Sequence, residues 1–583
     1  MKPKILVCVA LSVLFAIADT LGQTNMFLSN PDAIKILKGD YNPLHYRPSI
    51  IIDQPDSVRM GIIREVDQKE QTRLLNKLET FHNRNSGSDT LSQTTGIGAC
   101  RTWILSHFDQ VSKNNNNRLV TGYLEFDADI CTKGHHKNPF ALLPGMDTAS
   151  HEILVIEGHF DTRNEGRCDT EGYTPGIDDN GSGTILVMEL ARVMSKYSFR
   201  HTILFTTPTG EDEGIFGAKA WAEFLSLQGV KIRTVLNNDI VGGIYCGKTS
   251  SPPSCPYFGH ADSTHVRIFS YSSGNSSYAN SAHKQLARYM KYIQDELINP
   301  YLSTPLTINI MLGEDRTGRG GDHTPFRQKG YTAVRIISAN EHGNGTGTSP
   351  DRNHTTRDVL GKDLNGDGIL DSLFVNPGYL ARNTILNGVV TGLLASAPDK
   401  ISATVEAKNA GVVIKLPDGY KNANEIIIGI RKYQSKSLEF DTIFKVDFAD
   451  KIEVELSSGQ KNYLSIAPLK NGAPGLFSDE YEINLTAVES QEQKTGLRLF
   501  QNYPNPWSES TIIRLTAPQE YIDKPAVLQV RDLIGRVVHQ QNVVIDAEEI
   551  QIALRSTDLH PGLFTYSLIS AGKPIQSVLM YKN

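Results

Sequence analysis

The sequence predicts an α/β protein in which a three-layer α/β/α domain with a largely parallel mixed sheet precedes two small β-sandwich domains. Between about residues 60 and 395, strand-like apolar runs alternate with amphipathic helical runs, which is typical of strands joined by helices that cover a sheet. Beyond Ala397 and Pro398 the runs become short and strand-like, turn residues separate them, and no helical spacing intervenes. At 583 residues, with 39% hydrophobic residues, the chain is long enough for several folded domains.

The elements of the first domain follow from the spacing of apolar residues. Helical spacing begins with Glu65 to Phe81 and Ala99 to Phe108. Strands are expected at Leu119 to Phe126, Ile153 to Glu157, Thr202 to Thr206, Arg233 to Asn237, Val266 to Tyr271, Leu306 to Met311 and Ala333 to Ile337. Further helices are expected at Gly183 to Lys196, Ile215 to Gln228, Ala282 to Leu297 and Tyr379 to Leu394. In such sheets, ligands bind at the carboxyl ends of the strands.

The N-terminus has the layout of a secretory signal peptide, which we place at residues 1–18. Lys2 and Lys4 precede the apolar run Ile5 to Ile17, and small residues close the run. A buried structural helix is the alternative, but a charged start followed at once by an apolar core favours export. The run is too short to span a bilayer, and no other stretch of the sequence is long enough. We therefore expect export, no membrane span in the mature chain, and a leader with little structural signal at residues 19–60.

The charge of the chain gives no support for a polyanionic partner and says little else about function. The formal net charge is −6, which is mild for this length. No Lys/Arg cluster interleaved with aromatic residues occurs, so nothing favours nucleic acid or an anionic membrane as a partner.

An oxidising destination favours disulfide bonds among the five cysteines that follow Cys8. Cys246 and Cys255 are expected to pair, because they would close a short proline-containing loop. Cys100 with Cys131 is a looser candidate pair. Cys168 would then remain as a free buried thiol.

A histidine and several carboxylates follow the ends of expected strands. His159 and Asp161 come directly after one strand, Glu211 and Asp212 follow another, and Asp179 opens a glycine-rich turn before a helix. Each alone is more often a satisfied core or surface group, and the glycine-rich stretch alone is a common turn. Together at strand ends they predict a metal site, in which a carboxylate can give one oxygen to each of two ions. Asp179 is the natural bridge.

Five motifs in this part of the chain resemble, in order, those of the M28 family of zinc aminopeptidases. They are Gly158-His159-Phe160-Asp161, Gly176-Ile177-Asp178-Asp179-Asn180-Gly181-Ser182-Gly183, Gly210-Glu211-Asp212 with Gly214-Ile215-Phe216-Gly217-Ala218, Asn238-Asp239, and Asn353-His354-Thr355-Thr356-Arg357-Asp358. The resemblance covers about residues 60 to 395, and we place the domain at residues 61–397. It implies a zinc peptidase fold and two Zn²⁺ ions per domain.

The resemblance also implies a role for each matched residue. One ion would be bound by His159, Asp179 and Asp239, and the other by Asp179, Asp212 and His354. Asp179 would thus bind both ions. Glu211 would be the general base that takes a proton from water and returns it to the leaving amine. Asp161 would orient the imidazole of His159 from behind. His323, in the family-like segment Gly320 to Phe326, is better read as a substrate contact or a buried hydrogen-bonded residue than as a ligand.

The chain departs from the family pattern at two positions. The family usually has glutamate where this chain has Asp212, so the backbone would have to approach the metal more closely. Some members have a tyrosine where Asn353 stands, which puts assistance to the oxyanion in doubt. Asp178 and Glu213 lie beside the chosen residues, and a slip of one residue would exchange their roles.

The segment from Asp363 to Asp371 has the spacing of a calcium loop. Asp363, Asn365, Asp367 and Asp371 place oxygen side chains at alternate positions around a glycine. An EF-hand would have glutamate at the twelfth position, where Phe374 stands. Ca²⁺ binding and a plain Asp/Asn/Gly surface loop are both open interpretations.

The remainder of the chain predicts two β domains joined by a linker. Residues 399–487 weakly resemble a fibronectin type III domain, and residues 488–496 form the polar linker. Residues 497–583 resemble the type A C-terminal sorting domain of the type IX secretion system, through Phe500 to Trp507, Thr511 to Ile513, Val530 to Arg536 and Pro561 to Tyr566. That resemblance implies the type IX machinery as a partner, passage through the periplasm, and release or attachment at the cell surface.

Taken together, the sequence predicts a secreted two-zinc metallopeptidase acting on peptide substrates. Removal of N-terminal residues, as by an aminopeptidase, is the activity that the resemblance favours. Two alternatives stay open at this point. One is a glutaminyl cyclase-like enzyme of the same fold with one zinc, and the other is a non-catalytic surface adhesin whose sandwich domain does the binding.

Overall fold

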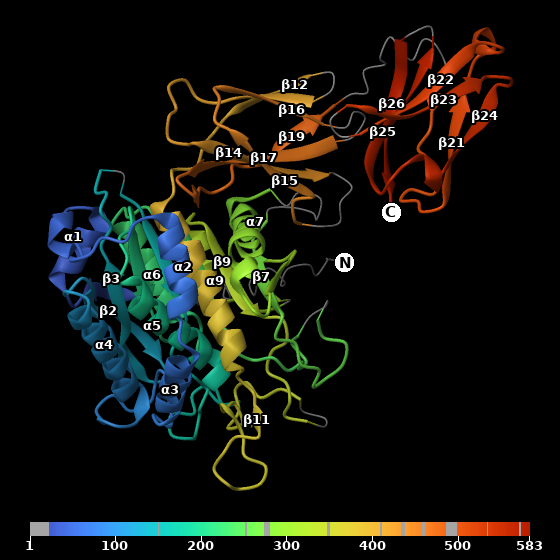
Figure 1. Cartoon of the computed structure of the whole chain (residues 1–583). Coiled ribbons are helices and arrows are strands. Elements are labelled where there is room, and N and C mark those ends of the chain that lie inside the picture. The colour runs from blue at the N-terminus through green and yellow to red at the C-terminus, as the bar shows by residue number, and fades with distance from the viewer. Residues whose placement is uncertain are drawn as a thin grey trace, which may run out of the picture. The chain divides into compact units, whose positions relative to one another are not determined.

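The computed structural model describes residues 23–583 except 150, 251–253, 273–279, 317, 347–349, 409–410, 433–437, 457–460, 486–497, 533–534 and 571–572. The expected signal peptide at 1–18 and linker at 488–496 lie outside the described residues. The chain divides into two compact units. The first holds Met1–Ala407, Val412–Val454 and Lys461–Asn484, and the second holds Lys408–Gly411, Glu455–Gln460 and Leu485–Asn583. Figure 1 shows the course of the chain through each unit.

A nine-stranded mixed sheet forms the centre of the first unit. In spatial order the strands are β1 (Thr24–Leu28), β2 (Val120–Ile130), β3 (Lys133–Leu143), β5 (Thr202–Thr206), β4 (Ile153–Glu157), β6 (Ile232–Asn238), β9 (Ala333–Ser338), β7 (His265–Ser270) and β8 (Thr307–Ile310). The four central strands from β5 to β9 are parallel, with Val155 opposite Leu204 and Val235. Antiparallel pairings join β1, β2, β3 and β5 and join β9 to β7, so the predicted mixed sheet is confirmed.

Helices cover both faces of this sheet and bury two separate hydrophobic clusters. The helices are α1 (Pro31–Lys38), α2 (Pro55–Glu65), α3 (Gln68–Glu79), α4 (Gly96–Asn114), α5 (Gly183–Met194), α6 (Phe216–Leu227), α7 (Ala282–Ile293), α8 (His323–Gln328) and α9 (Pro377–Ser396). Along β4, Leu154 and Ile156 join the cluster beneath α2, α5 and α9, which lie side by side in Figure 1. Ile153 and Val155 join the cluster beneath α1 and α6. This alternation of buried residues is what a strand between two helical layers requires.

The N-terminal part is more structured than the sequence predicts, so the expectation of a leader at 19–60 was wrong. It contributes β1, α1 and much of α2. Helix α1 starts at a proline after Asn30, whose side chain accepts a hydrogen bond from the backbone N–H of Asp32. The expected helix from Glu65 to Phe81 is also interrupted. Asp67 caps α3 by accepting from the backbone N–H of Lys69, and this cap separates α3 from α2.

Most residues of the two small sheets that follow belong to the same unit. They are β12–β13–β16 (Thr404–Lys408, Gly411–Lys415, Lys451–Glu455) and β15–β14–β17–β18 (Thr442–Asp447, Glu425–Lys432, Lys461–Lys470, Ala473–Pro474), with β19 (Tyr481–Asn484) paired to β17. Buried polar contacts tie them to α7. Gln285 donates to the Ser465 hydroxyl at 2.7 Å, and Arg288 lies 3.1 Å from Glu480. These sheets therefore pack as part of the first unit.

The second unit is a β-sandwich. Its sheets are β20–β21–β24 (Arg498–Leu499, Ser510–Thr516, Glu549–Arg555) and β23–β22–β25–β26 (Val537–Val544, Pro525–Arg531, Gly562–Ser570, Lys573–Lys582). The Tyr566 hydroxyl donates to the Phe500 carbonyl and accepts from the Asn502 N–H. This ties the opening motif of the expected sorting domain to its core strand. Leu533 and Ile534, in the motif from Val530 to Arg536, lie outside the described residues.

Two disulfide bonds are present in the first unit. Cys246 pairs with Cys255, as predicted, with a Cα–Cα distance of 5.5 Å. Cys131 pairs with Cys168, so the expected pairing of Cys131 with Cys100 was wrong, and so was the free Cys168. The reason is that Cys100 lies on the buried face of α4, whereas Cys131 and Cys168 lie on loops that leave β2 and β4.

The free thiol of Cys100 is expected to be unreactive in the folded protein. Burial raises the pKa of this thiol to about 12, so the reactive thiolate is scarce at neutral pH. A chain that starts at residue 23, treated with a thiol reagent without reductant, should show no labelling when folded and one label after unfolding. Cys100→Ser should abolish that label. Rapid labelling of the native protein would contradict this description of the core.

Candidate metal centre

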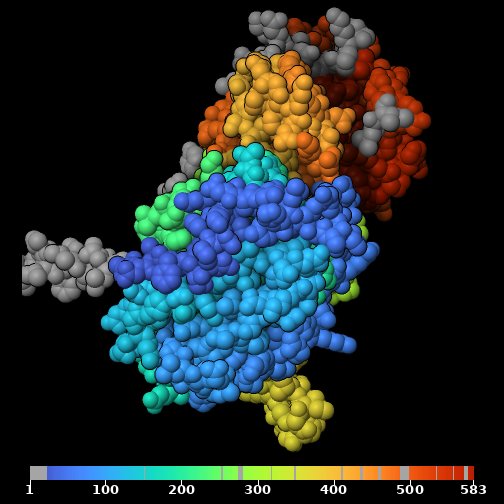
Figure 2. Space-filling view, turned by 90° about the vertical axis from the view of Figure 1, so that its left-hand side faces the viewer, coloured from blue at the N-terminus to red at the C-terminus, as the bar shows by residue number. Residues whose placement is uncertain are grey.

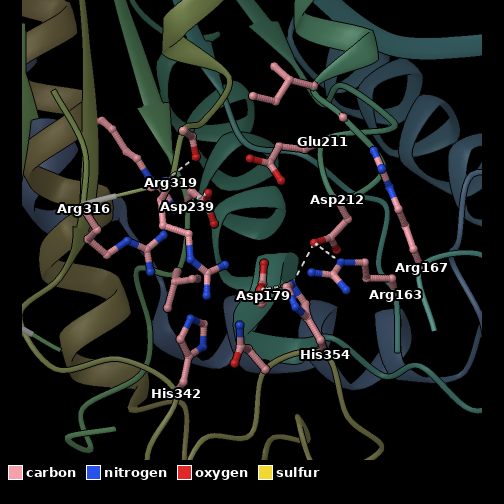
Figure 3. A pocket seen from close by; sticks show the side chains of 17 residues that line it. Arg163, Arg167, Asp179, Glu211, Asp212, Asp239, Arg316, Arg319, His342 and His354 are labelled. Atoms are coloured by element: carbon pink, nitrogen blue, oxygen red, sulfur yellow. Dashed lines mark hydrogen bonds and ion pairs between the residues drawn. The ribbon is translucent and has the colours of Figure 1, made fainter. Parts of the chain in front are cut away.

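The predicted site residues gather where the central parallel strands end. His159 follows β4 by two residues, Glu211 and Asp212 lie in the loop after β5, and Asp239 directly follows β6. Asp179 comes from the segment Ile177–Ser182 before α5, where its own backbone is not helical, and His354 comes from the loop after β9. Figure 3 shows Glu211, Asp212, Asp179, Asp239 and His354 around one cavity of about 250 Å³. The site is at the carboxyl edge of the sheet, as expected.

Asp179 stands between two groups of candidate ligands. Its Oδ1 lies 3.6 Å from His159 Nε2, which is also 3.6 Å from Asp239 Oδ1. Its Oδ2 lies 3.2 Å from His354 Nε2, which is 2.8 Å from Asp212 Oδ1. In each group the candidate ligand atoms all lie within 4.8 Å of one another. One carboxylate that faces two groups with its two oxygens has the geometry of a bridge between two ions.

The chemistry of these residues fits divalent cations. Both ring nitrogens of His159, Asp212 Oδ2 and Asp239 Oδ1 are buried and find no hydrogen-bond partner among the described residues. Burial by itself lowers the pKa of His354, but Asp212 and Asp179 raise it to about 10. The buried carboxylates thus require positive charge, which a proton on the histidine or a metal ion can supply. His and Asp side chains are suitable ligands for zinc.

A buried arginine fixes the two loops that carry His159 and Asp179. Arg84 donates from Nε to the Phe160 carbonyl at 2.9 Å, and from its two other nitrogens to the carbonyls of Pro175 and Gly176. From the other side, Asp358 accepts from the backbone N–H of Asp179 at 2.9 Å. Sequence reasoning missed Arg84, which sits in a polar segment that resembled an ordinary helix end.

Other side chains hold the candidate ligands from behind. Asp161 Oδ1 lies 3.5 Å from His159 Nδ1, and its Oδ2 accepts from the backbone N–H of Asp212 at 3.1 Å. Asp161 thus lies beside His159, and its hydrogen bond positions the backbone of Asp212. Arg335 on β9 bridges Asp239 and Asp315, at 2.6 Å from each. Sequence reasoning missed Arg335, although an arginine inside an otherwise apolar strand signals a buried charged partner.

Glu211 faces the cavity without belonging to either ligand group. Its Oε2 lies 3.9 Å from His159 Nε2, and its side chain is 14% exposed. Burial, with help from Asp239 and Asp212, raises the pKa of Glu211 to about 8. A carboxylate beside the candidate ions that is not itself needed as a ligand is available for proton transfer.

The neighbours that could have exchanged roles are engaged elsewhere. Asp178 Oδ1 accepts from the backbone N–H of Gly243 at 2.8 Å. Glu213 accepts from the Ser86 hydroxyl at 2.7 Å. His323 is buried, lies 3.1 Å from the Glu314 carbonyl through Nε2, and is absent from the described lining of the cavity. The geometry thus favours the chosen register, and it favours a buried hydrogen-bonded role for His323.

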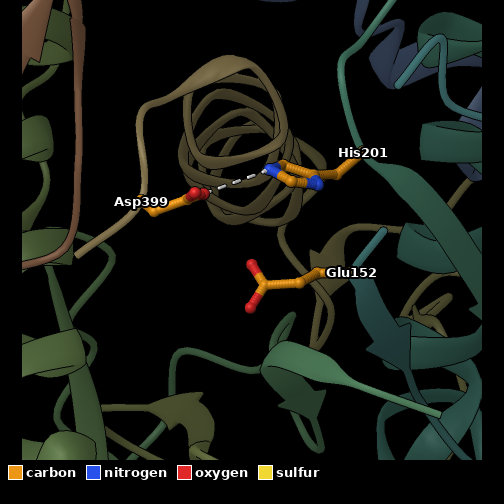
Figure 4. Close-up of side chains that lie close together, drawn as sticks. All are labelled: Glu152, His201 and Asp399. Carbon is orange, nitrogen blue, oxygen red and sulfur yellow. Dashed lines mark ion pairs between the residues drawn. The ribbon is translucent and has the colours of Figure 1, made fainter. Parts of the chain in front are cut away.

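A second histidine–carboxylate cluster has a different character. Glu152, His201 and Asp399 lie close together in Figure 4, with His201 Nε2 4.0 Å from Asp399 Oδ1. Arg233 occupies both carboxylates, at 2.7 Å from Glu152 and 2.5 Å from Asp399, and Arg200 lies 3.0 Å from Asp399. Because arginines already neutralise these carboxylates, the cluster does not call for a metal ion.

The candidate calcium loop forms the exposed turn between β10 (Gly361–Lys362) and β11 (Ser372–Leu373), which projects from the body in Figures 1 and 2. Asp363 accepts from the backbone N–H groups of Gly366 and Gly368, and Asp371 accepts from that of Leu364. These bonds account for the loop as a surface turn. Calcium binding stays a prediction.

A mixed sheet with candidate metal ligands gathered at strand ends is a feature of metal-dependent hydrolases built on an α/β sheet. Residues 138–370 match the model of peptidase family M28, and residues 501–580 match that of the secretion system C-terminal sorting domain. The chain therefore contains a peptidase family M28 domain and a C-terminal sorting domain, as the sequence motifs predicted. No helix in the described part of the chain is long and apolar enough to cross a membrane.

Relatives and solved structures are similar over parts of the chain. A probable zinc metalloprotease of Phaeosphaeria nodorum is 28% identical over 315 residues, which cover 49% of this chain and 61% of that relative. One of Pyricularia oryzae is 29% identical over 392 residues, covering 63% and 74%. The LapA aminopeptidase of Legionella pneumophila has a TM-score of 0.42 at 17% identity, covering 60% of this chain and 78% of its own. A glutaminyl cyclase of Porphyromonas gingivalis has a TM-score of 0.36 at 15% identity, covering 56% and 97%.

Proposed function

We propose that this protein is a secreted two-zinc aminopeptidase that releases N-terminal residues from peptides. The observation that carries the proposal is Asp179, whose two carboxylate oxygens face two separate ligand groups. The first would hold one ion with His159 and Asp239, and the second would hold the other with Asp212 and His354. A site for a single ion would fill only one of these two groups.

The residues of the chain divide the chemistry between them. When bound, two zinc ions would polarise the scissile carbonyl and lower the pKa of water. Glu211, which faces the same cavity, would take the proton of the attacking water and return it to the departing amine. Asp161 would keep the imidazole of His159 oriented, and Arg335 would hold Asp239.

Export through the type IX secretion machinery is part of the same proposal. The sorting domain at residues 501–580 supports it. Passage through the periplasm, followed by release or attachment at the cell surface, would be consistent with the disulfide bonds of the first unit.

Metal analysis and a substrate panel on one preparation test the proposed activity. We expect two zinc ions per chain and hydrolysis of peptides with a free N-terminus. Acetylation of the N-terminus should lower kcat/KM by about 100-fold or more, because an aminopeptidase uses the free amine to position its substrate. One zinc with cyclisation of N-terminal glutamine would support the cyclase alternative. Failure to retain zinc, with no turnover of any peptide in added zinc, would support the adhesin alternative.

A further inference from the structure

Arginine side chains line the cavity above the candidate metal centre. Figure 3 shows Arg163 and Arg167 on one side of the carboxylates, and Arg316 and Arg319 on the opposite side. Arg335 lies deeper, against Asp239. Guanidinium groups therefore line the cavity on two sides of the carboxylates.

Two of the five arginines are committed to carboxylates of the protein. Arg335 bridges Asp239 and Asp315. Arg316 lies 2.5 Å from Glu341 and 3.4 Å from Asp315. These pairs are buried or nearly so, and they build the wall of the cavity.

The guanidinium groups of the other three arginines have few described partners or none within the protein. Arg163 donates to the Asn164 carbonyl and reaches Asp212 only at 3.4 Å. The guanidinium groups of Arg167 and Arg319 make no hydrogen bond or ion pair with the described residues, and both side chains are exposed at the cavity. In the proposed enzyme Asp212 would serve as a metal ligand. Arg163, Arg167 and Arg319 are therefore left to bind an anion.

The charge balance of the cavity points to an anionic substrate. Five arginines line it, against the four acidic residues Asp179, Glu211, Asp212 and Asp239. The proposed metal ligands and the proposed base account for all four, so the described lining offers no further carboxylate to bind a substrate cation. Bound divalent ions would make the balance more positive. Among the described lining residues, Ile215 and Ile240 carry aliphatic side chains. An apolar substrate side chain would cover the guanidinium groups without offering them a hydrogen-bond acceptor, which would be unfavourable.

We propose that the site selects peptides that carry a carboxylate next to the scissile bond, held by Arg163, Arg167 and Arg319. This inference rests on the proposed peptidase function and names its substrate class. Guanidinium groups bind carboxylates through paired, charge-assisted hydrogen bonds. The carboxylate could belong to an acidic first residue, to an acidic second residue, or to the C-terminus of a dipeptide.

Matched acid and amide peptides test the inference and separate these sources. The pairs are Glu-Ala-amide with Gln-Ala-amide, Ala-Glu-amide with Ala-Gln-amide, and Ala-Ala with Ala-Ala-amide. We expect kcat/KM to favour the acid by about 10-fold or more in at least one pair, because a guanidinium–carboxylate contact is lost in its amide. Arg167→Gln and Arg319→Gln should each reduce that ratio. Arg64→Gln removes an equal charge from the exposed end of α2 and should leave the ratio unchanged.

Binding gives a second readout that does not depend on turnover. Glutarate and its monoamide glutaramate each offer one carboxylate to the ions, so calorimetry on the zinc-loaded protein isolates the effect of the second carboxylate. We expect tighter binding of glutarate, with the difference reduced in both arginine variants. Equal hydrolysis within all three pairs, together with equal binding, would overturn the inference while the peptidase function stands. Selective glutarate binding without hydrolysis of any peptide would retain the anion site and overturn the proposed function.

Discussion

Replacement of Glu211 by glutamine is expected to lower kcat by about 10²- to 10⁴-fold while the zinc content stays the same. The substitution keeps the shape of the side chain and removes its ability to accept a proton. Glu211 belongs to neither ligand group, although its Oε2 approaches to 3.9 Å from His159 Nε2. Metal analysis and steady-state kinetics on the same sample would show both halves of the result.

Glu213→Gln is the matched control for Glu211, because it removes a carboxylate two residues away in the same turn. Glu213 accepts hydrogen bonds from Asn85 and Ser86 and is absent from the described lining of the cavity. We expect this variant to be less stable but to keep most of its turnover. If Glu211→Gln were fully active, or if Glu213→Gln alone lost turnover, the assignment of the base would be wrong.

The parts of the site that could be predicted are those that depend on local sequence. His159, Asp239 and the Glu211-Asp212 pair each follow a buried apolar strand, and the order of strands in a parallel sheet brings such positions to one edge. His354 has no such strand before it. Its place in the site was predicted only from the resemblance of its motif to a family.

The parts that escaped prediction depend on contacts between segments distant in sequence. Arg84 reaches carbonyl groups about 76 to 92 residues away, and nothing in its neighbours specifies them. Arg335 pairs with Asp239 through the adjacency of β9 and β6, which only the fold reveals. The disulfide between Cys131 and Cys168 likewise depends on which loops meet at one edge of the sheet. Polar contacts of this kind leave no periodicity in the sequence.

Replacing a residue that binds both ions should remove more metal than replacing a residue that binds only one. Asp179 offers an oxygen to each group, whereas His354 contacts only the group with Asp212. Without Asp179, each group keeps two ligands, which is fewer than the three protein ligands typical of a catalytic zinc site. Without His354, the group of His159, Asp179 and Asp239 stays complete.

We therefore expect Asp179→Ala to lose both zinc ions and His354→Ala to lose one, with turnover reduced by about 10³-fold or more in each because either change removes metal-ion catalysis. Metal analysis after dialysis measures the zinc stoichiometry. Added zinc should raise the melting temperature of His354→Ala but not of Asp179→Ala, because zinc stabilises only a protein that still binds it. His342→Gln is the matched control, because His342 lines the cavity outside both groups. If the two alanine variants lost equal amounts of zinc, Asp179 would not be a bridge, and the one-zinc cyclase alternative would gain the support that the geometry now gives to the peptidase.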